Sequence, residues 1–98
     1  MANVLLGTAN PIYIDATGTL HVGWVTIQAI ALVGDETAGD DIAAADFFEI
    51  TDTAGNIIAS KMAAYDGDDF YISFPLGLKV NGLACTSIDG GIGYIYCE

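Results

Sequence analysis

Residues 19–33 run TLHVGWVTIQAIALV, an apolar segment whose spacing indicates a long β-strand. In its latter part, every second position is apolar and shares one parity: Val25, Ile27, Ala29, Ala31 and Val33. Such alternation is typical of a strand with one dry face. The residues just upstream fall on the opposite parity: Leu20, Val22 and Trp24. Because a strand cannot exchange its faces without an extra residue, the sequence predicts a bulge or bend near Gly23.

The same period-two pattern recurs along the rest of the chain. It predicts strands at 2–6, 11–15, 19–33, 46–52, 56–61, 69–74, 77–85 and 91–97. A set of about eight short strands without a long helical pattern predicts an all-β fold, namely a mostly antiparallel β-sandwich or jelly roll. The predicted core consists of inward-facing strand residues: Val25, Ile27, Phe48, Ile50, Phe70, Ile72 and Phe74.

Turn-forming residues separate the strands at 15–18, 52–56 and 89–91. Segment 40–46 contains a short Ala run that favours a loop or a single helical turn. If residues 89–91 close a hairpin, Cys85 pairs with Tyr94 and Cys97 with Gly82. The cysteines would then lie too far apart along the ladder for a disulfide, so the sequence predicts free thiols.

Length and charge exclude several classes of function. The 98 residues predict a single domain, 1–98, and a hydrophobic content of 53 % excludes intrinsic disorder. The net charge is −11, and Lys61 and Lys79 are the only Lys or Arg residues. They cannot build a phosphate-neutralising stripe, so we expect no nucleic-acid partner. The N-terminus lacks a secretory pattern and no apolar run approaches the roughly 20 residues of a membrane helix, so we expect synthesis in the cytoplasm and no membrane partner.

No motif for catalysis or for a cofactor stands out. His21 is the only imidazole, and no nucleophile motif lies near it, so we expect no catalytic residue and no enzymatic activity. The acidic segments 34–41 and 66–69 lack the spacing of a Ca²⁺ loop, although oxygen ligands for Ca²⁺ are present. His21, Cys85 and Cys97 have no recognised zinc spacing. We therefore predict no metal site and no cofactor, with Ca²⁺ binding by the acidic loops left open.

Aromatic residues offer a different kind of site. Several of them could stack on sugar rings or be buried at a protein interface: Trp24, Tyr65, Tyr71, Tyr94 and Tyr96. The same residue types are ordinary on the half-exposed face of a strand. A carbohydrate-binding or adhesin-type β-sandwich module is therefore an alternative prediction for this chain.

Four segments carry a resemblance to a known group of proteins: GTLHV (18–22), ITDTAGNIIA (50–59), FPLGLKVNGL (74–83) and GGIGYIY (90–96). This pattern of strand and turn residues resembles the small β-sandwich virion proteins of tailed bacteriophages. The resemblance implies a structural protein of the virion, made in the host cytoplasm, of the capsid decoration, cement or head-fibre type. It also implies contacts with the major capsid protein or another virion protein, and assembly as a trimer.

Self-assembly is expected on physical grounds as well. A sandwich of this size leaves strand edges uncovered, and only Lys61 and Lys79 are available to protect them. We therefore predict a closed homo-oligomer, with the trimer implied by the resemblance. Apolar residues are predicted at or near the contacts: Leu5, Trp24 and Tyr65. Acidic loop residues are predicted to point outward into solvent: Asp35, Glu36, Asp40, Asp66 and Asp68.

Overall fold

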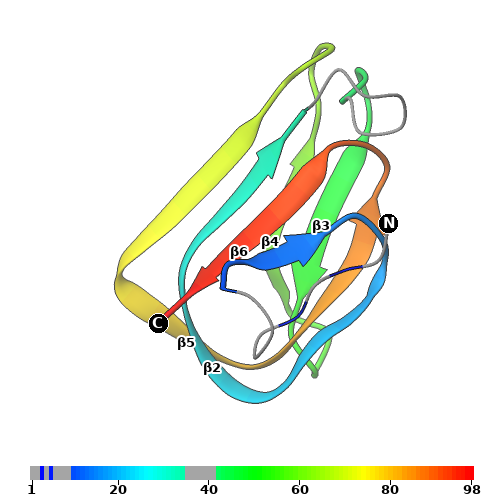
Figure 1. Cartoon of the computed structure of the whole chain (residues 1–98). Helices are drawn as coiled ribbons and strands as arrows, with labels where there is room; N and C mark the ends of the chain where they lie inside the picture. Colours follow the sequence, from blue (N-terminus) through cyan, green and yellow to red (C-terminus); the bar gives the residue numbers. More distant parts are fainter. Residues whose placement is uncertain (1–2, 4, 6–9, 35–41) are drawn as a thin grey trace.

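A computed structural model describes residues 3, 5, 10–34 and 42–98 of the chain. Its strands are β1 (Ile12–Ile14), β2 (Gly18–Val33), β3 (Phe47–Thr51), β4 (Ile57–Met62), β5 (Phe70–Ile88) and β6 (Ile92–Cys97). They form one antiparallel six-stranded sheet in the order β1-β6-β2-β5-β3-β4 (Figure 1). The all-β prediction is confirmed. None of the described segments contains a helix of the length and apolar character that crossing a membrane would require.

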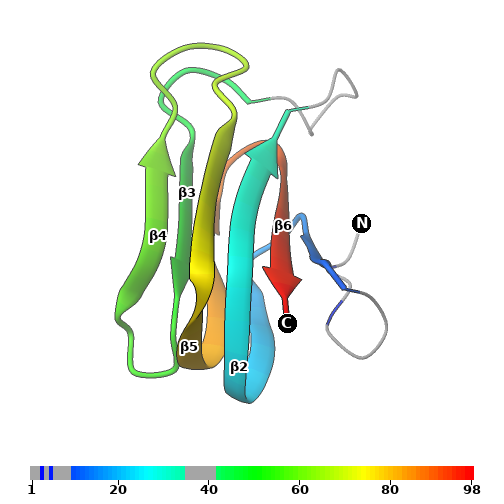
Figure 2. The same ribbon diagram turned by 90° about the vertical axis from the view of Figure 1, so that its left-hand side faces the viewer.

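The two long strands bend, and the sheet folds back on itself. Gly23 in β2 has a φ of 96°, and Gly82 in β5 has a φ of 83°, a conformation that glycine adopts without steric cost. The predicted bend near Gly23 is therefore confirmed. One part of the sheet, which we call the first half-sheet, contains β1, β6, residues 27–33 of β2 and residues 70–73 of β5. The second half-sheet contains β4, β3 and the remaining parts of β5 and β2. Figure 2 shows the second parts of β2 and β5 behind the first.

The core lies between the two half-sheets. Phe48 and Ile50 of β3 are buried together with Ile30 of β2 and Ile95 of β6. The halves approach closely, because a Cβ atom built at Gly93 would lie 3.1 Å from Cε1 of Phe48. Of the predicted core residues, three are buried and four are half-buried against the core: Ile27, Phe48 and Ile50, then Val25, Phe70, Ile72 and Phe74.

A second bulge in β2 corrects one part of the sequence interpretation. Ile27 pairs with Cys97 of β6, and the next paired residue of β2, Ala29, pairs with the adjacent Tyr96, so Gln28 is an extra residue relative to β6. An extra residue exchanges the faces of a strand. Ile30 and Leu32 therefore face the core, and Val33 is 37 % exposed. The prediction that Ala29, Ala31 and Val33 continue the dry face of Val25 and Ile27 is wrong.

The last two strands do not form a hairpin. β6 pairs with β1 and β2, whereas the end of β5 pairs with β3, so residues 89–91 connect the two half-sheets. Cys85 accordingly lies opposite Ile50, and Cys97 lies opposite Ile27. The predicted pairings with Tyr94 and Gly82 are wrong. Both cysteines are nevertheless buried free thiols, so that prediction is confirmed.

Most strand boundaries agree with the prediction to within a few residues, but two predicted strands form one. The predicted strands 69–74 and 77–85 are parts of the single strand β5. Residues 42–46 form a turn, as predicted for the described part of segment 40–46. The predicted strand 2–6 lies largely outside the described residues, which there include only Asn3 and Leu5.

Candidate interaction surface

Large apolar side chains are exposed where β2 and β5 bend. Leu76 is 100 % exposed, Val22 is 83 % exposed and Trp24 is 65 % exposed. Single exposed apolar residues are ordinary on a protein surface, whereas neighbouring ones mark interaction sites. The position of Leu76 and Trp24 relative to each other therefore matters for function.

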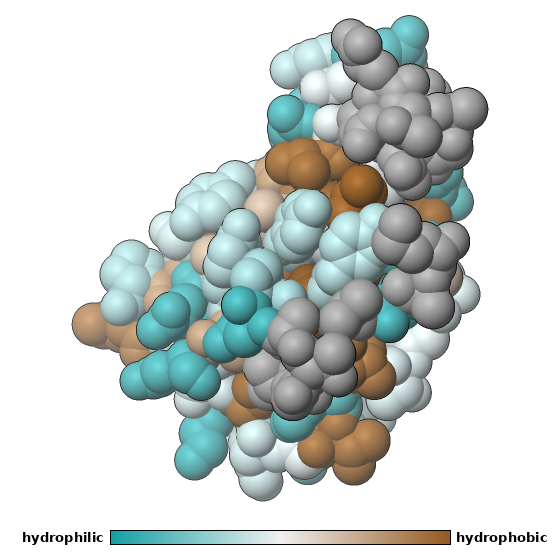
Figure 3. Space-filling model, viewed as in Figure 1, coloured by the Kyte–Doolittle hydropathy of each residue, from teal (hydrophilic) through white to brown (hydrophobic). Residues whose placement is uncertain are grey.

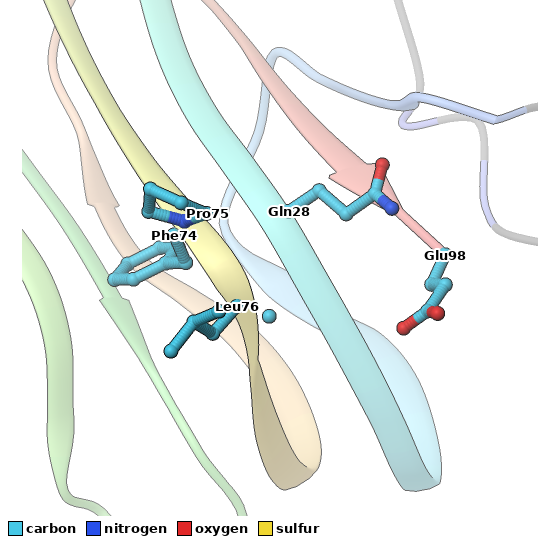
Figure 4. A pocket seen from close by; sticks show the side chains of 6 residues that line it. Gln28, Phe74, Pro75, Leu76 and Glu98 are labelled. Carbon is cyan, nitrogen blue, oxygen red and sulfur yellow. The ribbon is translucent and has the colours of Figure 1, made fainter.

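Leu76 is exposed because β5 bulges at this point. Ile27 pairs with Leu78 and Ala29 pairs with Ser73, so residues 74–77 of β5 lie opposite a single residue of β2, Gln28. Pro75 has no backbone N–H to contribute to the ladder. The bulge therefore directs Leu76 away from the sheet (Figure 4).

The bulge borders a surface hollow of about 220 Å³. Figure 4 shows the side chains of β5 on one side of it, with Gln28 and Glu98 across from them. Its lining residues are Gln28, Phe74, Pro75, Leu76, Gly77 and Glu98. A Cβ atom built at Gly77 would lie 2.7 Å from Cγ2 of Thr26, so glycine permits this close approach of β5 to β2.

A neighbouring hollow of about 430 Å³ continues the surface toward Trp24. It is lined by His21, Trp24, Val25, Thr26, Lys79 and Glu98, so Glu98 borders both hollows. Nζ of Lys79 lies 5.7 Å from the centroid of the Trp24 ring, within the range of a cation–π interaction. We call the surface formed by Trp24, Thr26, Leu76, Lys79 and Glu98 the bend surface.

The structure does not bring the three predicted contact residues together. Leu5, Trp24 and Tyr65 are 39 %, 65 % and 62 % exposed. Leu5 precedes β1, Trp24 lies at the bend, and Tyr65 lies in the loop between β4 and β5, at the other end of the sheet in Figure 2. Leu76 was missed because it falls between the predicted strands 69–74 and 77–85, so the alternating pattern assigned it to neither face.

Carboxylates at the end opposite the bend bind backbone amides. Asp66 accepts a hydrogen bond from the N–H of Ala44 at 2.9 Å, and Asp69 accepts one from the N–H of Gly34 at 3.0 Å. Asp66 is exposed as predicted, whereas Asp35, Glu36 and Asp40 lie outside the described residues. Within the described residues, no group of three or more His, Cys, Asp or Glu side chains is placed to hold a metal ion.

Asp68 departs from the prediction that it points outward. It is only 7 % exposed, because its Oδ2 accepts the N–H of Ala64 at 2.8 Å and lies 3.2 Å from Nζ of Lys61. The hydrogen bond from Ala64 is the main cause that holds the pKa of Asp68 below its usual value. Desolvation opposes this shift, and the charge of Lys61 adds to it.

His21, Cys85 and Cys97, the other side chains with potential for chemistry, do not form a common site. His21 is half-buried and borders the larger hollow. Burial raises the pKa of Cys85 to about 11 and also raises the pKa of Cys97. Since the thiolate is the reactive form, both cysteines are poor nucleophiles at neutral pH.

No protein-family model, no curated protein and no solved structure matches the chain. A function is therefore inferred from the residues and contacts described above.

Proposed function

We propose that the protein is a non-enzymatic structural protein of a virion, of the capsid decoration or cement type, which attaches to its partners through the bend surface. The observation that supports this proposal is the exposure of two large apolar side chains, Leu76 and Trp24, each of which lines one of two hollows that share Glu98. Burying a large apolar side chain is favourable by about 1.5–3 kcal/mol relative to leaving it in water. Tryptophan in particular is enriched among residues that dominate binding energy.

The distribution of charge supports contact through the bend surface. The chain carries a net charge of −11, and repulsion between like charges at an interface costs several kcal/mol. Asp66, Asp69 and Asp89 lie at the opposite end of the sheet, where they accept backbone hydrogen bonds. The bend surface instead combines one cation, Lys79, with one anion, Glu98. Subunits that meet at the bend therefore keep these three carboxylates away from those of their neighbours.

The partners we propose are other copies of this chain, in a trimer, and the major capsid protein or another virion protein. The strand order leaves β4 at one edge of the sheet, and its residues Ile57 and Met62 are each 61 % exposed. An exposed edge offers backbone groups for pairing with another chain. β4 therefore provides a second contact, which allows a subunit to touch a neighbour and the shell together.

Light scattering of the purified protein at micromolar concentration tests self-assembly. We expect a mass several times the 10.2 kDa of one chain. Combining Trp24→Ser with Leu76→Ser should yield the monomer, because it removes apolar area from the bend surface. Tyr65→Ser, a matched change of an exposed aromatic residue at the other end, should leave the oligomer intact. A wild-type monomer would refute self-assembly through this surface.

The composition of purified virions tests the function itself. We expect many copies of this polypeptide in particles of the virus that encodes it, and a gene position among capsid, portal and tail genes. Particles that lack the polypeptide would overturn the proposal. The double variant at the bend should be depleted from particles in comparison with Tyr65→Ser.

A further inference from the structure

The outer face of the first half-sheet carries a row of aromatic side chains. Tyr13 of β1 lies opposite Tyr94 of β6, Tyr94 lies opposite Ala31 of β2, and Ala31 lies opposite Tyr71 of β5. The row therefore crosses four neighbouring strands. One step along the strands, Ala29 lies between its partners Tyr96 and Ser73. We call these two rows the tyrosine face.

The tyrosine face points away from the core. The residues that alternate with it are buried between the half-sheets, as Ile12, Ile30 and Ile95 are each 0 % exposed. Tyr71 is 67 % exposed and Tyr96 is 39 % exposed. In Figure 3, pale and weakly hydrophilic side chains cross the middle of this side of the molecule, with brown apolar patches beside them.

Small and large side chains alternate across the face. Ala29 and Ala31 of β2 are only 6 % and 7 % exposed. Their short side chains therefore lie below the level of the aromatic rings on the neighbouring strands. Tyr13 and Tyr94 pack edge to face, with ring centroids 5.8 Å apart and planes at 76°. Such contact holds the Tyr94 ring in place. Tyr13 is therefore a positioning residue, and the rings available to a ligand belong to Tyr71, Tyr94 and Tyr96.

The spacing of the rings follows from the sheet. Tyr94 and Tyr71 lie on strands on either side of β2, so their backbones are separated by two strand spacings, or about 9.5 Å. Tyr94 and Tyr96 are two residues apart along β6, or about 6.8 Å. At these backbone separations one extended glycan chain can contact more than one tyrosine, and the apolar faces of sugar rings can stack on aromatic side chains. The hydroxyl groups of tyrosine and of Ser73 add hydrogen-bond partners for sugar hydroxyls.

Several classes of ligand can stack on tyrosine rings, and the charge of the chain favours a neutral one. The paired residues of the two rows are Tyr, Ala and Ser, and none of them is charged. At a net charge of −11, the protein repels nucleic acids and acidic polysaccharides. A neutral glycan fits both the uncharged rows and the overall charge.

We propose that the tyrosine face binds a neutral polysaccharide chain, in contact with Tyr71, Tyr94 and Tyr96. This face is distinct from the bend surface, since none of its residues lines either hollow there. A glycan bound at the tyrosine face therefore leaves Trp24 and Leu76 available for protein partners. The inference is independent of the proposed virion function.

Affinity electrophoresis of the full chain tests the proposal. The probes are native gels that contain dextran, mannan, galactan or xylan, and a gel that contains alginate serves as the acidic control. We expect retardation by at least one neutral polysaccharide and none by alginate. Loss of one stacked ring should weaken the affinity about tenfold, so Tyr71→Ala and Tyr96→Ala should each reduce the retardation. Tyr65→Ala, an exposed tyrosine outside the face, should leave it unchanged.

Chemical shifts provide a readout that does not depend on folding of the variants. Titration of the wild-type protein with oligosaccharides of the retarding polymer should shift the amide resonances of Ala29 and Ala31 and leave those of Trp24 and Leu76 unchanged. Absence of retardation in all four neutral gels would overturn the proposal, as would retardation by alginate alone. Equal retardation of Tyr71→Ala and the wild type would do the same. If the double variant Trp24→Ser with Leu76→Ser is still retarded by the polysaccharide, glycan binding does not depend on the bend surface.

Discussion

Nζ of Lys61 lies 3.2 Å from Oδ2 of Asp68, and this ion pair ties the edge strand β4 to the loop that leads into β5. The same oxygen accepts the N–H of Ala64, so Asp68 fixes both ends of the turn in which Tyr65 lies. Asp68→Ala should lower the melting temperature by several degrees. Lys61→Met should lower it less, because the hydrogen bond from Ala64 is the larger cause of the pKa shift of Asp68.

The effect of Asp68→Ala should also depend on pH. The pKa of Asp68 is lower in the folded protein than its ordinary value of 3.8, so its contribution to stability is present above that value and is lost as the pH falls through the folded pKa. Thermal melts from about pH 6 to about pH 3 should therefore show the difference between wild type and Asp68→Ala narrowing toward acid. A constant difference across this range would contradict the assigned role of Asp68.

Gly82 should tolerate substitution less well than Gly23. Both glycines have positive φ, and a non-glycine residue in such a conformation costs on the order of 1–3 kcal/mol. A Cβ atom at Gly82 would in addition overlap the side-chain hydroxyl of Thr53, whereas one at Gly23 would meet nothing within 4 Å. Urea denaturation should show a larger loss of stability for Gly82→Ala than for Gly23→Ala.

The overlap at Gly82 can be separated from backbone strain. Adding Thr53→Ala to Gly82→Ala should restore part of the lost stability, because it removes the hydroxyl group that the new Cβ meets. Thr53→Ala added to Gly23→Ala should restore nothing. Equal losses for the two glycine variants, with no recovery, would show that strain alone decides the effect.

The strands of this chain were predictable from period-two spacing, because that spacing reports which side chains are buried on one face. The bend at Gly23 was predictable because the apolar positions change from even to odd residue numbers there. The bulge at Gln28 gave no such signal, since small alanines at 29 and 31 and larger apolar residues at 30 and 32 fit either face. The sequence alone therefore could not show which face of this segment meets the core.

Pairing partners were less predictable than strands. The turn at 89–91 has the composition of a tight hairpin, yet β6 joins β1 and β2 because the connection passes from one half-sheet to the other. Trp24 was predicted as a contact residue from its residue type, whereas the exposure of Leu76 followed only from the register between β2 and β5. The tyrosine face likewise depends on pairings between β1, β6, β2 and β5, which are far apart in the sequence.

The two cysteines should be unreactive in the folded protein. Burial raises the pKa of Cys85 to about 11 and that of Cys97 in the same direction, so few thiolates exist at pH values near neutrality. An aromatic disulfide reagent should therefore react slowly with the native protein and fully with both thiols in denaturant. Ser60→Cys, on the exposed edge strand β4, should add one fast-reacting thiol. Native cysteines that react as fast as this added thiol would be inconsistent with their burial.

Close packing of the two half-sheets should make Gly93 sensitive to a single added methyl group. A Cβ atom there would lie 3.1 Å from Cε1 of Phe48 and 3.3 Å from Cβ of Ile14, and such overpacking of a core costs about 1–3 kcal/mol. Phe48→Leu alone should also destabilise the protein, since Phe48 is 1 % exposed. In combination, the smaller side chain makes room for the methyl group, so the double variant should lose less stability than the sum of the two single losses. A double-mutant cycle from urea denaturation measures this coupling, and additive losses would mean that Gly93 and Phe48 do not pack against each other across the core.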